Sequence, residues 1–198
     1  MEFKKIQLNG FKSFAEKTDF LIEDGLTGIV GPNGCGKSNI VESLRWAMGE
    51  TSAKSMRGSG MEDVIFSGTS NKASKNIAEV LVSVANNNNE GPVQFREFEV
   101  VNVRRKIEKD KGSKFYINDK EVRARDVQMF FADLSTGAHS PSMISQGRIG
   151  ALVTAKPTDR RAILEEAAGI SGLHVRRHEA ELRLNAAENN LKRADELR

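Results

Sequence analysis

The fold of this chain is decided by the stretch Gly31-Pro32-Asn33-Gly34-Cys35-Gly36-Lys37-Ser38. A glycine, four further residues and then Gly-Lys-Ser make up the P-loop pattern, in which glycines let backbone N–H groups turn toward phosphate oxygens. The apolar run at residues 26–30 predicts a short strand before the loop. Apolar residues at three- and four-residue spacing predict a helix from Lys37 that stops near Gly49. A strand, a glycine-rich loop and a helix in this order predict a phosphate-binding site.

Two side chains of the loop have expected contacts with a bound nucleotide. Lys37 would place its ammonium on the β- and γ-phosphates, and the Ser38 hydroxyl would ligate Mg²⁺. Cys35 is expected to act through its backbone rather than through its thiol. The loop therefore predicts ATP and Mg²⁺ as cofactors, with binding through all eight residues of the loop.

Composition limits the class of protein without identifying it. The chain has 198 residues, about one domain in length, and its 30 Lys and Arg against 27 Asp and Glu give a net charge of +3. This excess permits a nucleic-acid surface but does not demand one. A single cysteine excludes a disulfide framework or a cysteine-based zinc site, and no run approaches the roughly 18 apolar residues of a membrane span. We expect a cytoplasmic protein with no membrane partner.

The rest of the chain divides into a strand-rich middle and a helical end. Apolar alternation predicts strands near residues 3–8, 20–22, 80–85, 98–103 and 115–122, and a short helix over 125–134. From Pro157 the pattern is helical, and from Leu173 to Ala194 apolar or long side chains recur at a spacing of four and three. This heptad spacing predicts the start of a coiled coil.

A second motif lies well downstream of the P-loop. A short apolar segment ends in Ser145-Gln146-Gly147, which resembles the Q-loop of ABC-type ATPases. In those enzymes the Gln side-chain oxygen reaches Mg²⁺ and the attacking water. Gln146 is therefore expected to be a metal ligand and a catalytic residue.

The ordered set of motifs resembles the N-terminal half of the ATPase head of bacterial structural maintenance of chromosomes (SMC) proteins, which act in chromosome segregation and condensation. The matching stretches are residues 8–14 (LNGFKSF), 31–41 (GPNGCGKSNIV), 53–58 (AKSMRG), 61–66 (MEDVIF), 144–148 (ISQGR) and 160–170 (RRAILEEAAGI). The resemblance implies an α/β fold of the P-loop NTPase, ABC-ATPase type: a mixed sheet with an antiparallel β subdomain, leading into a coiled-coil helix. Residues 1–156 would form the N-terminal half of the head, and 157–198 the helix and the start of the N-terminal coiled-coil arm.

The same resemblance adds residues to the site. It implies that Arg57 lies near the nucleotide as a catalytic residue beside Lys37 and Gln146. It also implies nucleotide contacts for Asn39, Lys12, Ser13 and Asp63. Phe11, next to Lys12, is expected in the core.

The resemblance further implies a split catalyst that works in pairs. In SMC heads two P-loop domains sandwich two ATP molecules, and the Walker B carboxylates and the signature loop come from the C-terminal half. Neither motif occurs in this sequence: residues 134–138 (LSTGA) lack the second Gly and the Gln of the signature. We expect the full-length protein to be an ATPase, and this chain alone to bind ATP without hydrolysing it efficiently.

The expected partners follow from the family. They are the C-terminal half of the same protein, a second SMC chain in a homodimer, accessory kleisin-type subunits and double-stranded DNA bound without sequence specificity, on the nucleoid. Basic clusters would serve the DNA or be solvated faces. They lie at residues 104–106, 120–125, 160–161 and 176–177.

Three alternatives stay open from the sequence. A DNA-repair ATPase with coiled coils shares the P-loop and the Q-loop, but is not expected to carry residues 160–170 in this form. An ABC transporter subunit carries its signature within one compact chain, where this sequence has a heptad pattern instead. A non-enzymatic reading treats the chain as an assembly module whose last helix pairs with a returning coiled-coil segment.

Overall fold

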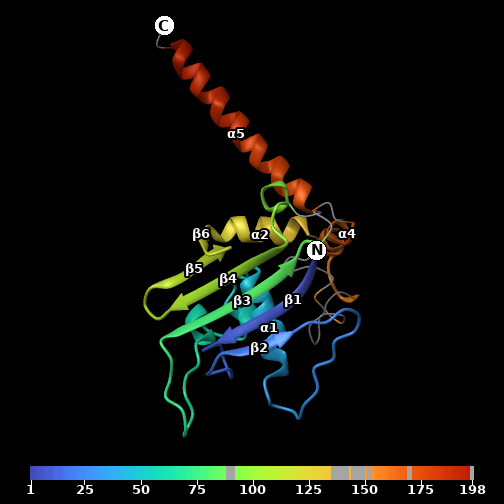
Figure 1. Cartoon of the computed structure of the whole chain (residues 1–198). Helices are drawn as coiled ribbons and strands as arrows, with labels where there is room; N and C mark the ends of the chain where they lie inside the picture. The colour runs from blue at the N-terminus through green and yellow to red at the C-terminus, as the bar shows by residue number, and fades with distance from the viewer. Residues whose placement is uncertain (88–91, 135–142, 144–149, 151–152, 169–170, 197–198) are drawn as a thin grey trace. The chain divides into compact units, whose positions relative to one another are not determined.

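The computed structural model describes residues 1–87, 92–134, 143, 150, 153–168 and 171–196 (Figure 1). The chain divides into two compact units, Met1–His139 and Ser140–Arg198. Each unit is described by itself.

The first unit is built on a six-stranded antiparallel sheet in the order β2-β1-β3-β4-β5-β6 (Figure 1). Consecutive strands β3 to β6 pair as hairpins, while β1 lies between β2 and β3. The strands are β1 (Glu2–Asn9), β2 (Thr18–Leu21), β3 (Ile77–Ala85), β4 (Val100–Glu108), β5 (Gly112–Ile117) and β6 (Lys120–Val122). Short 3₁₀ helices connect the elements in the described part of this unit: η1 (Lys54–Met56), η2 (Met61–Val64) and η3 (Val93–Phe95).

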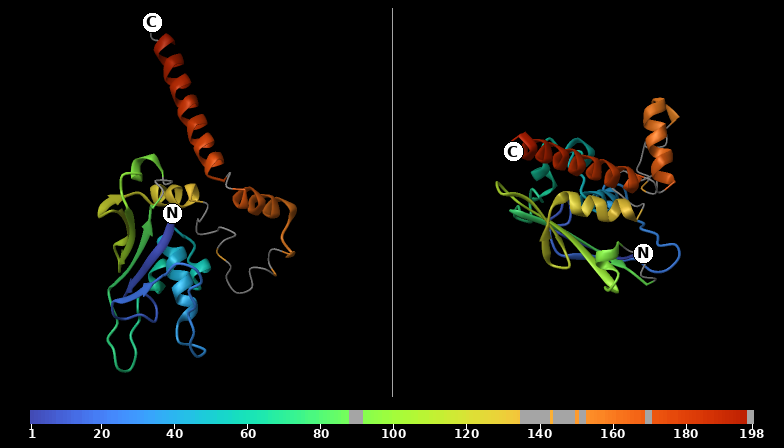
Figure 2. Two further views of the ribbon diagram at one scale, coloured as in Figure 1. Left: turned by 45° about the vertical axis from the view of Figure 1, so that its right-hand side comes forward. Right: turned by 90° about the horizontal axis from the view of Figure 1, so that it is seen from above.

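One face of this sheet is buried because apolar residues alternate along its strands. Val80, Val82 and Val84 on β3 are buried, as are Val101 and Val103 on β4. Helix α1 (Lys37–Ala47) packs on β3 and β4, and α2 (Ala124–Asp133) packs on β5. The view from above in Figure 2 shows α2 lying on one side of the sheet.

The core joins α1 to the first strand and its following turn. Trp46 near the end of α1 is fully buried, and its ring centroid lies 5.4 Å from that of Phe11. Leu8, Phe130 and Phe131 are also fully buried. These contacts fix the helix that begins at the P-loop against the sheet, and they confirm that Phe11 is a core residue.

Most predicted elements of this unit are confirmed. The strands near residues 3–8, 20–22 and 80–85 and the hairpin at 115–122 form, and the helix predicted over 125–134 is α2. The strand predicted at 98–103 begins at Val100 and continues to Glu108.

The strand predicted at residues 26–30 is wrong for the chain by itself. This segment is not in a strand, Leu26 is fully exposed, and Val30 is 94% exposed. An apolar segment adopts a stable strand only when neighbouring strands pair with its backbone and cover its side chains. Within the described residues no strand pairs with it.

A second correction concerns the basic cluster at residues 104–106. Arg104 and Arg105 point to opposite faces of β4, since successive side chains of a strand alternate. Arg105 is 2% exposed, while Arg104 forms ion pairs with Glu79 (3.5 Å) and Asp119 (3.1 Å). These two arginines therefore do not form a continuous surface for phosphates.

The second unit is helical, as predicted. Helix α4 (Pro157–Ala167) precedes α5 (Ser171–Glu196), on which Leu184 and Leu191 are exposed seven residues apart. Ion pairs between residues four apart, Arg161–Glu165 and Arg177–Glu181, support the two helices. Among the residues that the structure describes, no helix is both long and apolar enough to cross a bilayer.

Candidate nucleotide-binding site

The P-loop takes a conformation that requires glycine at two positions. Gly34 and Gly36 have φ angles of +82° and +93°, in the left-handed region that other residues rarely adopt. A Cβ on Gly36 would lie 2.5 Å from Oγ of Ser13, so the close approach of the loop to Ser13 also depends on this glycine. The two glycines let the chain turn sharply into α1.

Helix α1 begins at Lys37 without a side-chain cap. Gly36 occupies the N-cap position and has no side chain to cap the helix, while its carbonyl oxygen accepts a hydrogen bond from the N–H of Asn39 (2.9 Å). The N–H groups of Lys37 and Ser38, which precede Asn39 in the first turn, and the positive end of the helix dipole are therefore available to an anion. Ser38, in the first turn, is exposed, as a hydroxyl that ligates Mg²⁺ must be.

The side chain of Lys37 folds back over the P-loop. Its Nζ donates hydrogen bonds to the carbonyl oxygens of Gly31 and Pro32, both at 2.6 Å, and lies 3.8 Å from Sγ of Cys35. Cys35 is exposed. The positive charge thus lies within the P-loop, where a phosphate would bind.

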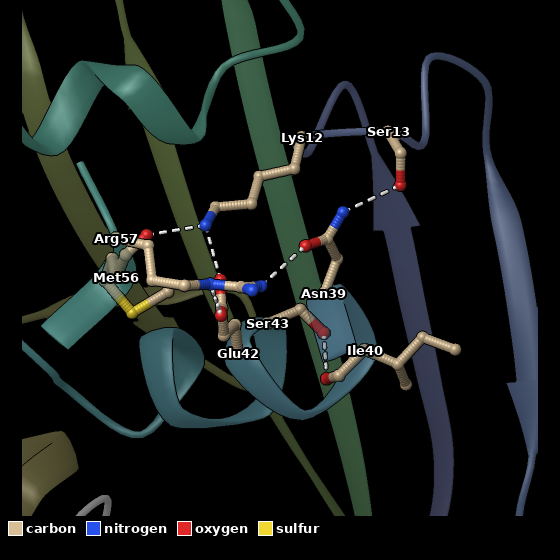
Figure 3. A network of polar contacts seen from close by, with 8 residues as sticks. All are labelled: Lys12, Ser13, Asn39, Ile40, Glu42, Ser43, Met56 and Arg57. Atoms are coloured by element: carbon tan, nitrogen blue, oxygen red, sulfur yellow. Dashed lines mark hydrogen bonds and ion pairs between the residues drawn. The ribbon is translucent and has the colours of Figure 1, made fainter. Parts of the chain in front are cut away.

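A polar network connects α1 to the turn after β1 and to the loop after η1 (Figure 3). The Glu42 carboxylate on α1 forms ion pairs with Lys12 through Oε2 and with Arg57 through Oε1. Arg57 also donates from Nη2 to Oδ1 of Asn39 (3.2 Å), whose amide donates to Oγ of Ser13 (2.9 Å). The network therefore joins four predicted site residues that lie on three different segments.

Asp63 organises the loop that carries Arg57. Its carboxylate accepts hydrogen bonds from the backbone N–H groups of Ser59 (2.6 Å) and Gly60 (3.0 Å). These two bonds, first that from Gly60, hold the pKa of Asp63 below its usual value, and the nearby charge of Lys12 acts in the same direction. Arg57 itself has a φ of +55°, so the turn is tight. Asp63 thus closes this turn through the backbone.

Glu42 is not among the predicted site residues, although the sequence carries a signal for it. Glu42 is one acidic residue in a helix whose other inward residues are apolar or small, and it is 9% exposed. A buried carboxylate needs cations or donors as partners. The expected metal and catalytic residue Gln146 lies outside the described residues, so its role stays a prediction.

The charges around the loop suit a polyphosphate. Lys12 and Arg57 share the carboxylate of Glu42, while the ammonium of Lys37 bonds to carbonyl oxygens of the loop. The start of α1, which has no side-chain cap, adds positive potential. The residues present fit Mg·ATP: a glycine-lined turn, an ammonium within it and an exposed hydroxyl in the first helical turn. These features support phosphate binding at this end of α1.

Comparisons with known proteins identify the family to which this chain is similar. The family model for the RecF/RecN/SMC N terminal domain matches residues 2–148. Chromosome partition protein Smc of Rhodopseudomonas palustris is 55% identical over 197 residues, which is 100% of this chain and 17% of that protein. The Smc protein of Myxococcus xanthus is 43% identical over 198 residues, which is 16% of its length. The chain therefore spans only about a sixth of these relatives.

Solved structures are similar to this chain in fold and, to a lesser degree, in sequence. A chain from a study of ATP-driven dimerization and DNA-stimulated activation of SMC ATPases has a TM-score of 0.72 and 29% identity, with 84% of this chain and 99% of that chain covered. The Pyrococcus furiosus Smc head with an extended coiled coil, bound to the C-terminal domain of ScpA, has a TM-score of 0.79 and 30% identity. That match covers 99% of this chain and 49% of the other. The chain belongs to the RecF/RecN/SMC N terminal domain family, and it corresponds to the N-terminal part of an SMC head.

Proposed function

We propose that this chain is the ATP-binding half of an SMC head that, together with the C-terminal half, drives ATP-dependent head engagement on DNA for chromosome condensation and segregation. One arrangement carries the proposal: the Lys37 ammonium lies over the P-loop, directly before the start of α1, which has no side-chain cap. Lys12, Ser13 and Arg57 belong to the polar network beside this helix start. This arrangement offers cations and N–H donors to a triphosphate.

The proposed roles of the residues follow from their positions. Lys37 neutralises charge on the β- and γ-phosphates, and Arg57 adds a second cation beside them. Ser38, with Gln146, would hold Mg²⁺, and the ion would supply positive charge that offsets the charge of the phosphates. The remaining contacts with the nucleotide come from the loop residues 31–36 and from Asn39, Lys12, Ser13 and Asp63, the last through the loop of Arg57.

The exposed segment at residues 26–30 supports completion by the C-terminal half. A cavity of about 550 Å³ lies between this segment and the edge strand β2, lined by residues that include Ile6, Phe20 and Ile29. Strands from the C-terminal half would pair with residues 26–30 and cover them, and would bring the Walker B carboxylates to the Mg²⁺ site. Without these carboxylates, the chain alone binds ATP but does not hydrolyse it efficiently.

The second unit supports a coiled-coil arm. We place the boundary at residues 156 and 157, so that α4 and α5 lead from the head into the arm. Leu184 and Leu191 are exposed at heptad spacing, as expected for a seam that a returning helix covers.

The proposed partners come from the relatives and the solved structures. The solved SMC heads were studied for ATP-driven dimerization and DNA stimulation, and others are bound to ScpA. By analogy this protein forms a homodimer, binds a kleisin-type subunit and binds double-stranded DNA without sequence specificity, on the nucleoid in the cytoplasm. The relatives above are SMC proteins, which favours this function over a DNA-repair ATPase or a transporter subunit.

Protection of Cys35 tests nucleotide binding at the P-loop. It is the single cysteine of the 198 residues, its thiol is exposed, and it lies inside the loop. Mg·ATP at ten times its dissociation constant should slow alkylation of Cys35 by iodoacetamide about tenfold, because only the free tenth of the chain reacts. Mass spectrometry over time gives the rate, and AMP, which lacks the β- and γ-phosphates, serves as the control. An unchanged rate at saturating Mg·ATP would count against binding at this loop.

A further inference from the structure

We propose that Glu42 is a positioning residue that holds Arg57 beside the phosphate site, with Lys12 as its fixed anchor. The inference rests on the proposed function, because it concerns the same nucleotide site. It adds a residue that neither the P-loop pattern nor the family motifs identified.

The first observation is that both carboxylate oxygens of Glu42 are engaged by different cations. Oε2 pairs with Nζ of Lys12 and Oε1 with Nε of Arg57 (Figure 3). Glu42 lies four residues after Ser38 on α1, so both side chains are on the same side of the helix. The carboxylate is therefore a bridge between two cations one turn below the P-loop.

The second observation is that the two cations differ in freedom. The side chain of Lys12 is 14% exposed, and its Nζ also donates to the carbonyl oxygen of Met56 (2.5 Å). The side chain of Arg57 is 59% exposed, and its other contact in the network is with Asn39. Lys12 thus fixes the carboxylate, and the carboxylate in turn restrains the more exposed arginine.

Charge explains why the restraint matters. Two cations brought together repel each other, and the shared carboxylate offsets this repulsion while leaving a net charge of +1 for the group. Without Glu42, the exposed guanidinium of Arg57 would gain more by turning into water than by staying beside Lys12. Glu42 therefore keeps positive charge near the phosphate site.

The restraint extends to the loop itself through neutral side chains. Arg57 donates to Asn39, Asn39 donates to Ser13, and Ser13 Oγ lies 2.5 Å from the position that a Cβ on Gly36 would take. The position of the guanidinium is thus linked to the turn that forms the P-loop.

A double-mutant cycle separates positioning from general stability. In Glu42→Gln the shape is kept, but the negative charge is lost and one of the two accepting oxygens becomes an NH₂ group, which can only donate. Measured on the 198-residue chain with Mg·ATP by calorimetry, Glu42→Gln and Arg57→Ala should each lower the affinity about tenfold, the value of one charged hydrogen bond. The double variant should also be about tenfold weaker, because Glu42 acts through Arg57.

A matched control is Glu50→Gln. Glu50 is a 3% exposed carboxylate paired with an arginine, Arg45, but it lies after the end of α1 away from the P-loop. It should leave the affinity unchanged. The proposal would be overturned if the double variant bound Mg·ATP about a hundredfold more weakly than the wild type, the product of the two single effects. A folded Glu42→Gln chain with wild-type affinity would also overturn it.

A second measurement tests the restraint of Arg57 by Glu42, here called the clamp, without any nucleotide. It therefore distinguishes failure of the clamp from failure of the proposed function. The Nε–H of Arg57 should give a slowly exchanging NMR signal in the wild-type chain and a fast one in Glu42→Gln. Equal, fast exchange in both would reject the clamp even if ATP binds. If Glu42→Gln does not fold, Glu42→Asp keeps the charge but is too short to reach both cations, and it should speed exchange in the same way; wild-type exchange there would reject the clamp. Slow exchange together with no binding of Mg·ATP would reject the nucleotide site instead.

Discussion

Replacing Lys37 with alanine should lower the affinity for Mg·ATP at least about hundredfold, because two charge-assisted contacts with phosphate oxygens are lost. In the structure the ammonium bonds to the carbonyl oxygens of Gly31 and Pro32, so the side chain already lies over the loop. A phosphate would take the place of these weaker partners. Calorimetric titration of the chain with Mg·ATP measures the effect.

The control for this prediction is Lys72→Ala. Lys72 is a surface lysine whose ion pair with Glu16 lies outside the network of the P-loop. It should bind Mg·ATP like the wild type, and both variants should have similar melting temperatures. If Lys37→Ala and Lys72→Ala bound equally well, the P-loop would not be the nucleotide site.

Replacing Arg105 with alanine should lower the free energy of unfolding by about 3 kcal/mol or more, since a buried hydrogen-bonded cation leaves its partners unpaired and a cavity behind. Its guanidinium lies 4.4 Å from the ring centre of Trp46 and 4.6 Å from that of Phe115. It donates to the carbonyl oxygens of Trp46 (2.8 Å) and Glu50 (2.6 Å), at the carboxyl end of α1. Urea unfolding followed by circular dichroism gives the value.

The neighbouring Arg104 supplies a matched control. It lies on the other face of the same strand, where its side chain is 26% exposed, pairs with Glu79 and Asp119, and lies over the ring of Tyr116. Arg104→Ala should cost about 1 kcal/mol, less than Arg105→Ala, because ion pairs that water reaches contribute little. Equal losses for the two variants would mean that Arg105 does not hold α1 to the sheet.

The protonation of Arg105 agrees with this role. Burial lowers the pKa of its guanidinium to about 10, and the charge of Glu50 opposes the shift. The group therefore stays positively charged at neutral pH and can interact with the negative end of the helix dipole of α1. Because α1 begins at the P-loop, Arg105 fixes the far end of the helix that carries the site.

Local patterns predicted what depends on nearby residues. The glycine spacing predicted the P-loop, and the apolar spacing after Lys37 predicted α1. Both depend on hydrogen bonds and side chains a few residues apart. The alternation along β4 also indicated that Arg105 is buried, because it follows Val101 and Val103 on the same face of the strand. The run of three basic residues at 104–106 suggested an exposed surface instead.

Features that depend on distant chain segments could not be predicted in the same way. Residues 26–30 have the composition of a buried strand, but pairing needs neighbours that this chain does not supply among its described residues. The single acidic residue on the inward side of α1 indicates that Glu42 needs cationic partners, but not which ones. Its partners Lys12 and Arg57 reach it only on folding, and spacing along the sequence does not identify them.

The central claim is that this chain is one half of a split ATPase, and phosphate release tests it most directly. The chain alone and the chain mixed with its C-terminal half would be compared at saturating Mg·ATP. We predict negligible turnover alone and at least about a hundredfold increase in the mixture, because oriented carboxylates and the second half of the Mg²⁺ site are then present. The mixture with Lys37→Ala should again be inactive. Robust turnover by the chain alone, or none in a mixture that forms a stable complex, would contradict the account.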